Sequence, residues 1–69
     1  MTPEAYRAAL AIAIERTTQS IARADAAAED AERNGWSGAD AHRTFAAGMR
    51  AHLIALGNAL AAAEAEADA

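Results

Sequence analysis

The sequence predicts an all-α fold: an antiparallel two-helix hairpin with coiled-coil packing that dimerises into a four-helix bundle. Three observations predict it. Alanine, the strongest helix former, fills 24 of the 69 positions. Turn-forming residues gather near the middle of the chain, at Asn34-Gly35. On either side of that point, apolar residues recur every three or four positions, as they do along one face of a helix. We therefore expect a single domain, residues 1–69.

The first helix has a clear start. Thr2 fits the N-cap position and Pro3 the first helical position, and Glu4 suits the positive end of the helix dipole. No glycine or proline then follows until Gly35. We predict a helix from about residue 3 to about residue 33.

The predicted turn covers residues 34–37. Gly35 can adopt the left-handed conformation that ends many helices. Ser37, with Asp40 three residues later, matches a capping box, so we expect Ser37 to cap the second helix. The turn residues are therefore accounted for by capping chemistry.

The second helix is predicted from about residue 38 to about residue 66. Its last turn carries acidic side chains, the wrong charge for the negative end of a helix dipole. These residues, which we expect to fray, are Glu64, Glu66 and Asp68.

Each predicted helix carries a seam, which we define as its series of heptad positions alternating by four and three. The first seam is Leu10, Ile14, Thr17, Ile21, Ala24, Ala28 and Ala31. The second seam is Ala39, His42, Ala46, Met49, Leu53, Leu56, Leu60 and Ala63. Two such seams joined by a tight turn predict coiled-coil packing within the hairpin.

A chain of 69 residues without cysteine buries too little apolar surface to be comfortably stable alone. We therefore expect a homodimer or another protein partner. Five residues lie off the seams or at the bend and form the predicted partner interface: Ile12, Trp36, Phe45, His52 and Ile54.

Trp36, the only tryptophan, has two interpretations. Tryptophan is enriched among interface hot spots, so it can anchor a partner. The interpretation we favour is structural: the indole packs across the bend and covers the ends of both helices.

Trp36-Ser37-Gly38, a Trp-x-Gly at the bend of two alanine-rich helices, resembles the WXG100 family. The segment with Phe45, Met49 and Leu53 looks like the second helix of that family. The resemblance implies a dimerising helical hairpin exported by type VII secretion. The family's Tyr-x-x-x-Asp/Glu export signal has no counterpart after the second helix, so export would require a partner that supplies it.

Catalysis, cofactors and metals are not expected. No spacing of a nucleophile and a base, and no glycine-rich phosphate loop, occurs in the sequence. Neither His42 nor His52 has a histidine, cysteine or carboxylate three or four residues away on its own helix. We predict a non-enzymatic protein-protein interaction module.

Two alternatives remain open. One is a small phage- or plasmid-encoded accessory protein that binds and modulates a host protein. The use of arginine without lysine indicates a GC-rich genome, such as that of an actinobacterium or its phages. The other is an RNA-binding hairpin, with arginines spaced by seven residues on each helix: Arg16 and Arg23, and Arg43 and Arg50.

Charge and hydropathy argue against nucleic acid and membrane as partners. Acidic residues outnumber basic ones by ten to six, and the net charge is −4. The longest uncharged run, residues 51–63, is too short to span a bilayer. No signal peptide pattern is present, so we expect a cytoplasmic protein, with secretion by a signal-independent route left open.

Overall fold

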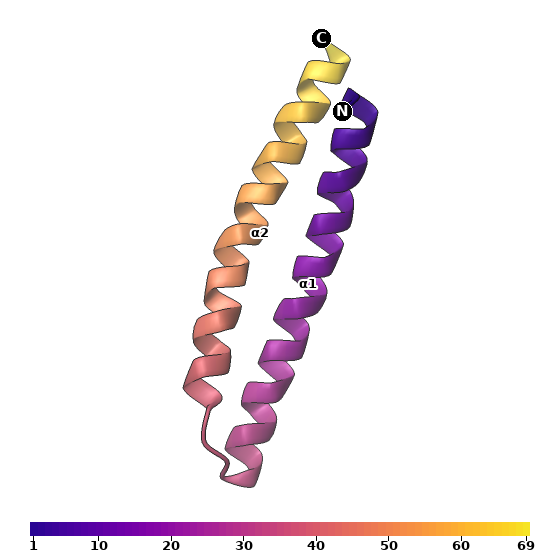
Figure 1. The fold of residues 1–69 in the computed structure, drawn as a ribbon. Helices are drawn as coiled ribbons and strands as arrows, with labels where there is room; N and C mark the ends of the chain where they lie inside the picture. The colour runs from indigo at the N-terminus through magenta and orange to yellow at the C-terminus, as the bar shows by residue number, and fades with distance from the viewer.

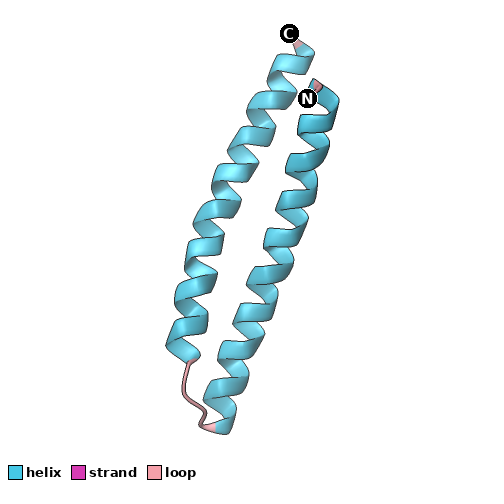
Figure 2. Ribbon diagram, in the orientation of Figure 1, coloured by secondary structure: helices cyan, strands magenta, loops and turns pink.

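The computed structural model describes residues 1–69 as two long helices, α1 (Pro3–Asn34) and α2 (Ala39–Asp68). They lie side by side and antiparallel, joined at one end by a short connection, with both termini at the other end (Figure 1). No strand is present (Figure 2). The molecule measures 53 × 15 × 15 Å. The predicted all-α hairpin is confirmed.

The start of α1 follows the prediction. The Thr2 side chain accepts a hydrogen bond from the Ala5 backbone N–H at 3.1 Å, and Pro3 occupies the first helical position. This pairing satisfies one of the backbone donors that every helix leaves free at its N-terminus.

The end of α1 is a Schellman motif. Gly35 adopts φ +70°, in the left-handed region. Its N–H donates to the carbonyl of Glu32, and the N–H of Trp36 donates to the carbonyl of Ala31 at 2.8 Å. These two bonds satisfy carbonyls that the end of the helix would otherwise leave unpaired.

We expect Gly35→Ala to lower the free energy of unfolding by about 1 to 2 kcal/mol, because an L-residue resists the left-handed conformation. Gly57→Ala is the matched control. Gly57 lies inside α2, where an added methyl group meets open space, so alanine should stabilise by about 0.5 to 1 kcal/mol. Urea unfolding, monitored by circular dichroism, measures the free energy of unfolding of both variants. Equal effects of the two changes would contradict this account of the bend.

The predicted cap of α2 was wrong. Gly38, with φ +101°, is the N-cap, and no side chain caps the helix. The first backbone bond of the helix runs from the His42 N–H to the Gly38 carbonyl at 3.1 Å. Because the left-handed turn at Gly38 delays the helix to Ala39, Ser37 stands one residue too early to cap it.

The end of α2 also differs from the prediction. The helix continues to Asp68 rather than fraying after Glu66. Alanine at positions 65 and 67 has the highest helix propensity of any residue, which offsets the unfavourable charge at this end.

The hairpin core follows the two predicted seams. Every seam position is buried or half-buried except His42, which is exposed. The most enclosed side chains near the bend are alanines: Ala28, Ala31 and Ala46 are 2, 3 and 0% exposed. The core near the bend is therefore made of small, almost fully enclosed side chains.

Trp36 does not cover the bend. It is 64% exposed, so the expected packing of its indole over the helix ends was wrong. The Schellman motif uses the backbone of Trp36 and not its side chain.

Candidate functional site

The hairpin has a thin core and a large apolar surface. Only seven residues are buried, and no large side chain is completely enclosed. The large seam residues of α2 are only half-buried: Met49, Leu53, Leu56 and Leu60. Six large apolar side chains are exposed: Met1, Tyr6, Ile12, Trp36, Phe45 and Ile54. The surface of the hairpin, rather than an internal cavity, is therefore the candidate site.

Two long faces flank the plane of the two helices. On α1, Asp25 and Ala27 stand on opposite sides of the buried Ala24, because each residue turns the helix by about 100°. Asp25 pairs with Arg50 of α2, whereas Ala27 shares a hollow with Phe45 of α2. The two sides of the hairpin thus carry different chemistry.

We call the first side the ion-pair face. It is defined by two pairs that join the helices, Asp25 with Arg50 and Glu32 with Arg43. All four side chains are at least 40% exposed. Exposed pairs contribute about 0 to 1 kcal/mol each, so they add little stability but keep this face charged and hydrated.

The ion pairs bear on the RNA-binding alternative. Arg43 and Arg50, one of the two predicted phosphate-binding stripes, are both held by carboxylates of α1. On the other stripe, Arg23 donates to the Ser20 hydroxyl at 3.1 Å. Phosphate binding by Arg43 and Arg50 would have to displace the carboxylates that already neutralise them.

We call the opposite side the aromatic face. Its residues recur every seven positions, so they form one column along each helix. The column on α1 is Tyr6, Ala13, Ser20 and Ala27. The column on α2 is Phe45, His52, Ala59 and Glu66. Shared hollows join the two columns at both ends of the hairpin, through Tyr6 with Glu66 and Ala27 with Phe45.

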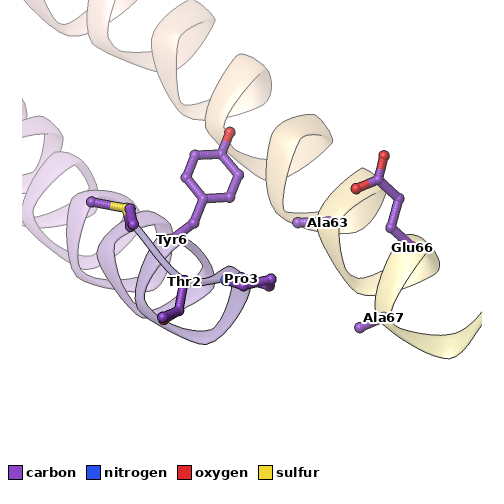
Figure 3. Close-up of a pocket in the computed structure, with 7 residues that line it drawn as sticks. Thr2, Pro3, Tyr6, Ala63, Glu66 and Ala67 are labelled. Atoms are coloured by element: carbon purple, nitrogen blue, oxygen red, sulfur yellow. The ribbon is translucent and has the colours of Figure 1, made fainter.

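A second hollow beside Tyr6, which Met1, Thr2 and Pro3 also line, lies at the open end of the hairpin. In Figure 3 the Tyr6 ring rises from α1, and Ala63, Glu66 and Ala67 line the facing part of α2. Its volume of about 450 Å³ is within the range of small-molecule sites. Only two helices border it, so it is open to solvent. This shape suits a protruding side chain of another protein better than an enclosed ligand.

The structure separates the predicted interface residues. Phe45 and His52 are seven residues apart and so lie on the same side of α2, the aromatic face. Ile54 lies on the other side of α2, because nine residues after Phe45 turn the helix by about half a rotation. Ile12 is on the side of α1 away from α2, and Trp36 is at the bend. These five exposed or surface residues therefore do not form one patch.

The partner interface predicted from the sequence did not include Tyr6. It is 46% exposed and stands on the aromatic face at the end opposite Phe45. The signal was present in the sequence: Tyr6 lies seven-residue steps from Ser20 and Ala27, beside the first seam. The heptad pattern of one helix does not show which of its columns shares a face with a column of the other helix.

No group of three or more histidine, aspartate and glutamate side chains is close enough to hold a metal ion. Neither helix combines the length and the apolar character needed to cross a membrane. Comparison with protein-family models, with curated proteins and with solved structures finds no match to this chain.

Proposed function

We propose that this chain is a non-enzymatic protein-protein interaction module that self-associates as a homodimer. In this proposal two hairpins form a four-helix bundle, with coiled-coil packing along the two seams within each hairpin. Apolar and aromatic side chains that one hairpin leaves exposed are then covered by a second.

The accessible surface is the observation that carries the proposal. The hairpin exposes 4763 Å². A compact monomer of its 7.1 kDa mass would expose about 4,100 Å². The excess of roughly 700 Å² is close to the area of about 800 Å² that each partner buries in a stable interface of standard size. This excess of exposed surface supports the proposal that a second copy covers part of the hairpin.

Sedimentation equilibrium at micromolar concentration tests the proposal. We expect a mass twice the 7.1 kDa of one chain. A species that stays at the monomer mass over the whole concentration range, with a cooperative and high melting temperature, would contradict it, because the exposed apolar residues would then need no partner.

We also expect the dimer to tighten as salt is added. Each chain carries a net charge of −4, so two copies repel each other. Raising the salt from 0.01 to 0.1 M shortens the screening length from about 30 to about 10 Å and weakens that repulsion. The dissociation constant, measured by sedimentation at several NaCl concentrations, should fall. Binding to RNA would show the reverse, since salt weakens phosphate contacts.

The WXG100-like version of the proposal adds export by type VII secretion. Its support is the resemblance at Trp36-Ser37-Gly38 together with the position of this motif between two antiparallel helices. A neighbouring gene for a partner that carries the export signal, beside secretion components, would support this version. A phage or plasmid neighbourhood would favour an accessory protein instead.

One observation favours binding to a second, different protein. Trp36 is 64% exposed at the bend, away from both long faces. Tryptophan is enriched in interface hot spots, and a dimer formed through a long face leaves the bend free. In this second candidate function the bend of a dimer binds a host protein, which Trp36→Ala should weaken without changing the dimer mass.

A further inference from the structure

We infer that two copies of this chain associate through the aromatic face, leaving the ion-pair face in solvent. This inference rests on the proposed self-association and adds which side of the hairpin is covered. The occupant of the aromatic face is a second copy of the same face, related by a two-fold axis.

Charge disfavours the ion-pair face as the covered one. Covering it would remove Asp25, Arg50, Glu32 and Arg43 from water, although each pair is now at least 40% exposed. The loss of hydration of buried charges commonly exceeds the attraction between them. Covering the ion-pair face would desolvate four charged side chains, whereas two, Arg23 and Glu66, line the hollows of the aromatic face.

The aromatic face is complementary to itself. It carries one exposed aromatic ring near each end, Tyr6 on α1 and Phe45 on α2. Beside each ring is a hollow whose walls include small side chains. The hollow beside Phe45 is lined by Ala24 and Ala27 together with three polar side chains, Ser20, Arg23 and His42. The hollow beside Tyr6 is lined by Ala59, Ala62 and Ala63, with Glu66 at its side.

A two-fold axis brings rings and hollows together. Two arrangements are possible. If the two bends lie at opposite ends of the dimer, α1 packs against α1 of the partner; Tyr6 then reaches the hollow at the partner's Ala27, and Phe45 reaches the hollow at the partner's Ala62. If the two bends lie at the same end, α1 packs against α2 of the partner; Tyr6 then reaches the hollow at the partner's Ala62, and Phe45 reaches the hollow at the partner's Ala27. Large groups therefore meet small ones in either direction, which is the condition for close packing.

The size of the face fits this role. The face runs along a molecule that is 53 Å long and 15 Å wide. A standard stable interface buries about 800 Å² per partner, so an interface of that size would extend along most of the hairpin. The polar groups midway along this face, Ser20 and His52, can each donate and accept hydrogen bonds across the axis.

Two matched variants of α2 test the inference. Phe45 is 53% and Ile54 66% exposed, on opposite sides of the same helix. Phe45→Glu should raise the dimer dissociation constant by at least about 100-fold, because it replaces an aromatic anchor of the interface with a carboxylate. Ile54→Glu should change it by less than about 3-fold, as surface substitutions outside an interface do. Sedimentation equilibrium gives the constants, and circular dichroism confirms that each variant is helical.

The outcomes separate this inference from the proposed function. If Ile54→Glu dissociates the dimer and Phe45→Glu does not, the choice of face is overturned while self-association stands. Wild-type protein that remains monomeric overturns both. If Phe45→Glu loses its helical signal, Tyr6→Glu and Ile12→Glu repeat the test on α1, where these residues are 46 and 50% exposed. A dimer unchanged by Tyr6→Glu then overturns the inference.

Discussion

Replacing Ile21 with alanine is expected to lower the free energy of unfolding by about 2 to 4 kcal/mol, the cost of truncating a large buried side chain. Ile21 is 8% exposed at the middle of α1, and with Leu10 it is one of only two large apolar side chains in the buried set. A chain of 69 residues has a total stability of roughly 3 to 10 kcal/mol, so the loss is a large fraction of it.

The control for this change is Ile12→Ala in the same helix. Ile12 is 50% exposed on the side of α1 away from α2, so the same truncation should cost less than about 1 kcal/mol. Both changes alter helix propensity equally, so the difference between them measures burial alone. The comparison uses urea unfolding at one protein concentration, because dimerisation makes stability depend on concentration. Similar losses for both variants would show that Ile21 is no more important to the hairpin than Ile12.

Enlarging Ala46 to leucine is expected to cost about 1 to 3 kcal/mol, because overpacking forces neighbouring groups apart. Ala46 is 0% exposed, and Ala28 on the other helix is 2% exposed. The two helices approach closely in this region because both side chains are single methyl groups. A leucine here would push α2 away from α1 near the bend.

Ala47→Leu is the matched control for Ala46→Leu. Ala47 is the next residue of α2 and is exposed, and leucine and alanine have similar helix propensities. Its effect on the free energy of unfolding should stay within about 0.5 kcal/mol. Thermal unfolding separates the two variants, since each kcal/mol shifts the midpoint by about 4 to 8 °C in a domain of this size. A midpoint for Ala46→Leu at or above that of the wild type would mean that the bend end has unfilled space.

The closely packed bend explains why the two ends of the hairpin differ. Near the bend the core consists of alanines, and the helices need no large side chains between them. Towards the open end the seam of α2 consists of leucines that are only half-buried, such as Leu56 and Leu60. The half-buried leucines of the α2 seam therefore lie towards the open end, whereas Trp36 is the exposed apolar side chain at the bend.

Local chemistry made the helices predictable. The Thr2 cap, Pro3 and the left-handed Gly35 are short-range signals, and each acts as the sequence predicts. The seams were predictable for the same reason: a heptad pattern determines which side of a helix is apolar before any partner is known. Ser37 failed as a cap because Gly38 offered a second left-handed position, and the choice between the two depends on how the chain crosses from one helix to the other.

By itself, the sequence determined that this protein forms two helices with one apolar seam each, joined by a glycine turn. Helix propensity, capping and periodicity act over a few residues, so no three-dimensional information was needed. Only the tertiary structure decided which column of residues beside the seam of α1 shares a side of the hairpin with which column of α2. It placed Tyr6 with Phe45 on one face, and Arg43 and Arg50 with carboxylates on the other. The physical reason is that the pairing of columns depends on the rotation of each helix about its own axis, and the packing of both seams together determines that rotation.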